Sequence, residues 1–435
     1  MKKRKVSKKY KTQKTKKIRK TSPVMAFLLT LALILGVGLS SMLFYMAVFH
    51  DTATAGKNTS ASRTELSGSE DNAFHFFWEA IPEKEEETSV QEESRYGALL
   101  ADPDAMKAGN IYAKPNKKEG IVSLGFAGDI LFDDEYAIMA NLLRRGVTIE
   151  NGISEPLLSR MREVDIMMVN NEFPYTDRGT PTEGKTYTFR ADTSTVSYLE
   201  DMGADIVSLA NNHCYDFGEV GLLDTLDTLE GAGIPYVGAG RNLEEASKPV
   251  YFISGDIKIA VVSATQIERL DNPDTKGATD ISPGVFRCWN PDKLYETVAQ
   301  AKANSDFVVV YIHWGTENVT EPDWAQLDQA PELVKAGADL IIGDHPHCLQ
   351  GIQYFDNVPV IYSLGNFWFN SKTVDTCMVQ VDISKDGIEA FQFIPAIQQD
   401  CRTDFAYGTE KERIISYMRE ISYGVTIDSE GYVSR

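Results

Sequence analysis

The sequence predicts one large α/β domain with a mainly parallel, buried sheet, preceded by a single membrane-spanning helix. Three observations lead to this fold class. Short β-rich runs alternate with helical patterns from residue 121 onward, as in βαβ units. A stretch of 25 residues near the N-terminus holds no charged side chain. The 435 residues are 43% hydrophobic, which is enough to fill a core of that size.

The charge is divided unevenly along the chain. Residues 1–20 carry 12 Lys or Arg and no acidic residue, which leaves 31 basic against 63 acidic residues, a net charge of −32, in residues 21–435. A nucleic-acid-binding protein needs a basic surface on its folded part. We therefore expect no nucleic-acid partner.

The uncharged stretch, residues 25–49, is long enough to cross a bilayer, which takes about 20 apolar residues. The apolar core of a cleaved signal peptide is shorter, about 7–15 residues. We predict a signal-anchor helix at 25–49 behind a basic cytoplasmic tail at 1–24. Positive charge stays inside, so the rest of the chain should be extracellular and the protein a single-pass component of the cell membrane. Cleavage near Ala53-Thr54-Ala55 is the alternative.

The remainder divides into three parts. Residues 50–118 are rich in Ser, Thr, Glu, Asn and Lys, a composition too polar to form a core, and we predict a stalk or linker. The α/β domain should cover 119–400, followed by a C-terminal tail at 401–435 with a helix at 409–421. The predicted strands are 121–128, 165–170, 205–210, 258–264, 306–313, 339–343 and 358–365. The predicted helices are 132–145, 154–163, 218–231, 291–303 and 325–336, and residues 373–383 and 387–396 should form a hairpin.

The cysteines are few for an exported protein, odd in number, and include no CxxC pair: Cys214, Cys288, Cys348, Cys377 and Cys401. We expect the fold to depend on its core, with one or two disulfides left open. Cys214 and Cys348 each follow a histidine, so that a thiolate ligand or a disulfide is conceivable. A small, buried and inert side chain is the simpler interpretation.

The positions of the histidines are the main functional signal. Four of the six lie at or just beyond the C-terminal ends of predicted strands: His213, His313, His345 and His347. Ligands of open α/β sheets bind at that edge. Acidic and amide residues follow the first three strands there: Asp129, Glu172, Asn211 and Asn212. This set of oxygen and imidazole donors predicts a divalent-metal site.

The motifs GDILF, NNEFP, SLANNHCYDFGEVGLLDTLDTLEGAGIPYVGAGRN, HWGTE, GADLIIGDHPHCLQG and YSLGNFWF occur in this order. They resemble the CapA/PgsA family of capsule-synthesis proteins over residues 119–395. The ANNHxxDxG and GxHPH elements are the specific part of this likeness. The resemblance implies a calcineurin-like metallophosphoesterase α/β sandwich and an association with poly-γ-glutamate.

The resemblance also implies two divalent cations, with Mn, Mg, Zn and Fe not distinguished. The implied metal ligands are Asp129 for the first ion, Glu172 as the bridging carboxylate, Asn212, His313 and His345 for the second ion, and His347 returning to the first. One departure is that Leu131 stands where the wider phosphoesterase pattern has a histidine. The first ion should therefore lack a nitrogen ligand.

Three residues are the candidate catalytic groups. His213 is the candidate general acid, and Asp216 would orient its imidazole. Arg190 would steady an anionic group of the substrate. Asn211, Glu317 and Asn366 are either further site residues or structural caps.

Two functions remain open. The extracellular domain is either a metal-dependent hydrolase or transferase acting on phosphoester or acyl bonds, or a non-catalytic, polymer-binding accessory subunit of a capsule synthesis and export complex. The expected partners are an anionic envelope polymer such as poly-γ-glutamate and integral-membrane synthase subunits. An acidic body repels a polyanion over a Debye length of ~8 Å, so polymer binding should depend on divalent cations.

Overall fold

The computed structural model describes residues 94–267 and 275–435. The predicted cytoplasmic tail, the signal-anchor helix at 25–49 and most of the predicted stalk lie outside these residues. Among the helices within them, none has the length and apolar character needed to cross a membrane.

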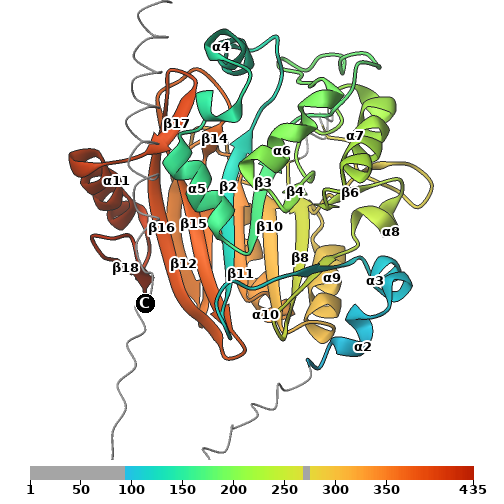
Figure 1. Ribbon diagram of the computed structural model, residues 1–435, viewed down its shortest axis with the longest axis vertical. Helices are drawn as coiled ribbons and strands as arrows, with labels where there is room; N and C mark the ends of the chain where they lie inside the picture. The colour runs from blue at the N-terminus through green and yellow to red at the C-terminus, as the bar shows by residue number, and fades with distance from the viewer. Residues whose placement is uncertain (1–93, 268–274) are drawn as a thin grey trace, which may run out of the picture. The chain divides into compact units, whose positions relative to one another are not determined.

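Two β-sheets pack face to face, and helices cover their outer faces (Figure 1). In spatial order, the seven-stranded sheet holds β1 (Ile111–Lys114), β7 (Val250–Ser254), β8 (Ile257–Thr265), β10 (Phe307–His313), β11 (Leu340–Asp344), β13 (Val358–Ser363) and β12 (Gln350–Phe355). The eight-stranded sheet holds β17 (Arg402–Phe405), β16 (Gly387–Gln399), β15 (Val374–Ser384), β2 (Val122–Ile130), β3 (Ile166–Asn171), β4 (Ile206–Ser208) and β5 (Tyr236–Val237), with β14 (Asn366–Trp368) paired to β2. The described residues therefore form a layered α/β domain, as predicted.

Strand β10 shows why both faces of the central strands are apolar. Phe307, Val309 and Tyr311 belong to the core between the two sheets. The alternate residues of the strand belong to the cluster that packs under α9 (Asp292–Ala303) and α10 (Trp324–Ala336). A strand buried on both faces reads as a continuous apolar run, as FVVVYIH does.

The eight-stranded sheet is covered in the same way. Its outer face packs against apolar residues of α4 (Ala137–Arg145), α5 (Glu155–Glu163), α6 (Ser197–Met202) and α7 (Gly218–Ala232). Every predicted strand and helix of the α/β domain is present, with ends displaced by at most a few residues, and β15 and β16 form the predicted hairpin. The helix predicted from residue 132 begins only at Ala137.

The folded unit extends past both predicted boundaries of the domain. Strand β1 lies in the predicted stalk, yet it pairs in parallel with β7 at the sheet edge. Helix α11 (Gly408–Ile421) lies in the predicted tail, yet it buries Ile414, Ile415 and Met418 in the core between the sheets. The stalk prediction is therefore wrong for residues 94–118, and 401–435 is not a separate tail. The composition of each region, averaged over its whole length, did not reveal the short apolar segments in β1 and α11.

The structure leaves all five cysteines as free thiols. Cys214 is buried beside the candidate site, and burial raises the pKa of its thiol. A buried thiol with a raised pKa is a poor nucleophile and a poor ligand, in agreement with the inert interpretation. The disulfides left open by the sequence are not formed.

Truncating Met418 to alanine is expected to lower the free energy of unfolding by about 2–5 kcal/mol, because it leaves a cavity in the inter-sheet core. Urea unfolding of the full chain measures this loss. Ser416→Ala, at an exposed position of the same helix, is the matched control and should change stability by no more than about 0.5 kcal/mol. Equal effects of the two substitutions would show that α11 is not part of the core.

Candidate metal centre

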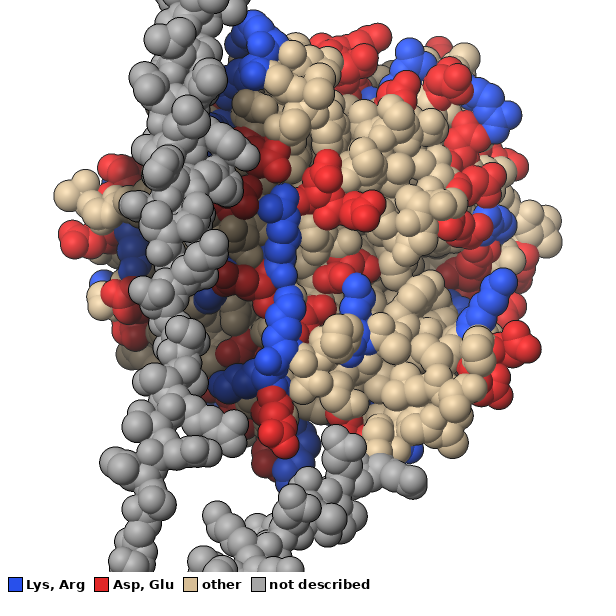
Figure 2. Space-filling model, viewed as in Figure 1, with Lys and Arg blue, Asp and Glu red and all other residues tan. Residues whose placement is uncertain are grey.

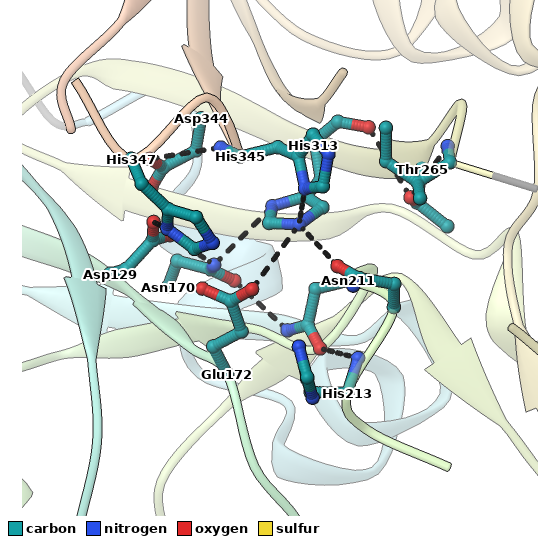
Figure 3. Close-up of polar contacts among 12 residues, drawn as sticks. Asp129, Asn170, Glu172, Asn211, His213, Thr265, His313, Asp344, His345 and His347 are labelled. Carbon is teal, nitrogen blue, oxygen red and sulfur yellow. Dashed lines mark hydrogen bonds and ion pairs between the residues drawn. The ribbon is translucent and has the colours of Figure 1, made fainter. Parts of the chain in front are cut away.

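Polar residues from both sheets lie at one common edge, where their central parallel strands end. At the end of β10, His313 is in register with Asp344 of β11. In the other sheet, Asp129 of β2 is in register with Asn170 of β3 and with Asn366 of β14. All of these side chains are buried, and those of Asp129, Asn170 and His313 point toward one another (Figure 3).

A first group of ligand atoms comes from Asp129, Glu172 and His347, and these atoms lie within 4.8 Å of one another. The His347 Nδ1 atom is 3.0 Å from Asp129 Oδ2. Burial raises the pKa of Asp129, but the hydrogen bond and the charge of His347 outweigh it and bring that pKa to about 2. Asp129 is therefore ionised at neutral pH and can serve as an anionic ligand.

A second group comes from Glu172, His313 and His345, again within 4.8 Å. The His313 Nε2 atom is 3.0 Å from His345 Nδ1, 2.8 Å from Asn212 Oδ1 and 3.6 Å from Glu172 Oε1. Burial lowers the pKa of His313 to about 3 and that of His345 well below its usual value. Both rings are consequently neutral, the form in which imidazole binds metals.

Glu172 belongs to both groups and provides the test of whether a cation fits. Both of its carboxylate oxygens are buried, and neither accepts a hydrogen bond from any described residue. Burial and the neighbouring Asp129 raise its pKa well above the usual range. A buried carboxylate without a hydrogen-bond partner is costly, and a cation between the two ligand groups would satisfy it. The residues present therefore fit a divalent metal.

Comparison with known proteins gives the family. The model of the family described as bacterial capsule synthesis protein PGA_cap matches residues 123–371, more than half of the chain, and this span holds all the ligand atoms above. The chain belongs to the PGA_cap family.

Curated relatives agree with this assignment. The chain is 30% identical over 289 residues to the PGA biosynthesis protein CapA of Bacillus subtilis, covering 64% of this chain and 72% of that protein. It is 33% identical over 232 residues to the capsule biosynthesis protein CapA of Bacillus anthracis, covering 52% and 55%. A Mycobacterium tuberculosis protein named "Probable polyglutamine synthesis accessory protein" is 30% identical over 284 residues, covering 60% and 74%.

The PGA_cap domain brings together all six residues that the sequence proposed as ligands. Of the other candidates, Asn211 has a structural position, because its Oδ1 accepts the backbone N–H groups of His213 and Cys214. Glu317 is exposed. Leu131 is buried in the hydrophobic core under the helices, so no ligand comes from that position.

The candidate catalytic residues form a second cluster beside the metal ligands. His213 Nδ1 is 2.7 Å from Asp216 Oδ2, and Lys185 Nζ is 2.5 Å from Asp216 Oδ1. The backbone N–H of Phe189 donates to the same carboxylate, and the Phe189 ring lies against His213 at 4.2 Å between centroids. The imidazole is therefore fixed on two sides.

Arg190 lies at the border of this cluster. Its guanidinium is 4.8 Å from the ring centroid of Phe217, a cation–π distance. Within the described residues it forms no ion pair. Its charge is thus available to an anionic group.

Three polar residues of the site were missed by the sequence reasoning. Asn170 donates to Asp129 Oδ1 at 2.7 Å and accepts from Asn211 at 3.0 Å. Asp344 accepts from the Tyr311 hydroxyl at 2.7 Å, and Lys185 holds Asp216. Asn170 and Asp344 stand inside the NNEFP and GDHPH motifs, where a search for buried polar neighbours could have found them. Lys185 lies in a loop without a recognisable pattern.

The loop after β11 carries two histidines in an uncommon backbone conformation. His345 has φ 98° and His347 has φ 57°, in the region that favours glycine. Each such residue costs about 1–3 kcal/mol, and it persists where its surroundings determine it. Both residues are ligand candidates, so the uncommon backbone conformation coincides with the candidate metal centre.

Proposed function

We propose that this chain is a divalent-metal-dependent protein of capsule or poly-γ-glutamate biosynthesis, anchored in the cell membrane by residues 25–49 with its α/β domain outside. The family assignment and the names of the relatives support the biosynthetic role. The basic segment before an uncharged stretch supports the anchor and its orientation. The resemblance of the motifs to the CapA/PgsA family implies a metallophosphoesterase-like domain, which supports a phosphoester or acyl substrate.

The observation that carries the proposal is the position of Glu172 between two ligand groups. Asp129, Glu172 and His347 would hold one cation, and Glu172, Asn212, His313 and His345 would hold the other. Two such cations, when bound, polarise a phosphoryl or acyl oxygen and lower the pKa of bound water. The ions are among Mn, Mg, Zn and Fe.

The residues beside the ligands would handle protons and charge. Burial lowers the pKa of His213, although Asp216 opposes this, so that the imidazole is neutral. Its Nδ1–H donates to Asp216, and Nε2 is the atom that would take up a proton and return it to a leaving group. Arg190 would bind an anionic part of the substrate.

A second candidate function is polymer binding without catalysis, as an accessory subunit of an envelope synthesis and export complex with integral-membrane synthase subunits. The name of the Mycobacterium relative, an accessory protein, favours this. Acidic and basic side chains are mixed on the viewed face, with no broad basic surface for a polyanion (Figure 2). Binding of poly-γ-glutamate would then need bridging cations, and strong binding in excess chelator would contradict it.

Metal content and hydrolysis of the full chain, purified without chelator, distinguish these functions. We expect about two divalent ions per chain and cleavage of a model phosphodiester or a γ-glutamyl peptide. In a His313→Ala, His345→Ala double variant the cleavage should be lost and about one ion should remain, held by Asp129, Glu172 and His347. Metal without turnover would favour the accessory function. Wild-type protein without metal would overturn the proposal.

A further inference from the structure

The two ligand groups are unequal in number. The second group offers four side chains once the amide of Asn212 is included. The first group offers three: Asp129, Glu172 and His347. Divalent cations in proteins take at least four ligands, and Mg²⁺ takes six. A cation in the first group therefore needs at least one further ligand atom near His347.

The side-chain oxygen of Asn366 lies where this further ligand is needed. Its Oδ1 is 2.8 Å from His347 Nδ1, the same nitrogen that is 3.0 Å from Asp129 Oδ2. A ring nitrogen has at most one hydrogen to share between these two oxygens. Asn366 is 1% exposed, so water competes little for its oxygen. Three potential metal-ligand atoms, one nitrogen and two oxygens, thus converge around at most one shared hydrogen. The ligand atoms around His313 converge in the same way.

The backbone explains how Asn366 reaches this position. It is in register with Asp129 across the β14–β2 pair. A Cβ at Gly128 would lie 1.9 Å from the carbonyl oxygen of Gly365, so only glycine lets the two segments approach so closely. Gly365 itself has φ 69°. The two glycines bring Asn366 beside Asp129.

We infer that Asn366 is the fourth protein ligand of the first cation. The inference rests on the proposed function, because it presupposes that Asp129, Glu172 and His347 bind a metal. Each group then has one amide oxygen, Asn366 in the first and Asn212 in the second. An amide adds a ligand without adding negative charge to a cluster that already holds three buried carboxylates, those of Asp129, Glu172 and Asp344.

Titration of metal-free full chain with Mn²⁺ tests the inference. Wild-type protein is expected to bind two ions, with the magnetic coupling of a close pair in its electron paramagnetic resonance spectrum. In Asn366→Ala one of the two affinities should fall about 10–100-fold, and the coupled signal should disappear at low Mn²⁺. Asn366→Asp keeps an oxygen there and should bind two ions. Asn370→Ala, four residues along and bonded to Gln398 instead, is the control and should match wild type.

The outcomes distinguish the role of Asn366 from the existence of the metal centre. Unchanged affinities in Asn366→Ala overturn the role of Asn366 and leave the metal centre standing. Wild-type protein that binds no Mn²⁺ overturns the proposed function itself. Thermal unfolding verifies that each variant is folded. If Asn366→Ala does not fold, the folded Asn366→Asp must still bind two ions, and fewer would contradict the inference.

Discussion

Glu172→Gln is expected to abolish the binding of both cations, with a loss of at least about a hundredfold in affinity. The substitution keeps the shape of the side chain and removes the charge that both ligand groups share. Loss of a single peripheral ligand should affect one ion, whereas loss of the shared carboxylate should affect two. Equilibrium dialysis against Mn²⁺ measures the number of ions bound.

The same variant should be more stable than wild type when both are free of metal. Burial and Asp129 raise the pKa of Glu172, so folding must either bury its charge or protonate it, whereas glutamine is neutral in both states; we expect a gain of about 1–3 kcal/mol. Added metal at a thousand times its Kd should stabilise wild type by about 4 kcal/mol for each ion bound and leave the variant unchanged. Glu219→Gln, at an exposed position of α7, is the control for both measurements. A Glu172→Gln protein that binds two ions normally would contradict the shared role.

His213→Gln is expected to reduce hydrolysis by about 10²–10⁴-fold while leaving both cations bound. The glutamine amide can still contact Asp216, but it cannot take up and return a proton. The measurement is turnover of the model substrate together with metal content in the same preparation.

The matched control is Tyr187→Phe, an exposed side chain of the loop that holds Phe189, and it should leave both values near those of wild type. Unchanged turnover in His213→Gln would remove this residue from the chemistry. Loss of metal in that variant would instead place the imidazole among the ligands.

Much of the fold, and the position of the candidate metal site at the strand ends, could be predicted from local sequence. An apolar run such as FVVVYIH predicts a buried strand, and the histidine at its end lies at the sheet edge where ligands bind. His313, Glu172 and Asp129 could be predicted in this way because each lies at the end of such a run or within two residues of it. This prediction needed no knowledge of which strands are neighbours.

The remainder depended on contacts between distant segments. The pairing of β14 with β2 brings Asn366 beside Asp129, and nothing local in YSLGNFWF indicates that partner. Lys185 meets Asp216 from an irregular loop, where no periodicity reports burial. Strand β1 is only four residues long, too short to stand out from its polar surroundings. These features depend on tertiary contacts, which the local composition of the sequence does not reveal.

The assembly of the centre from both sheets has a consequence for biogenesis. Asp129 precedes its contact His347 by 218 residues, and Asn366 follows later still. A nascent chain emerging from the ribosome would have neither group complete until most of the domain has been synthesised. The ions would then enter a nearly finished protein, and metal supply would govern the last step of maturation rather than the initial collapse of the chain.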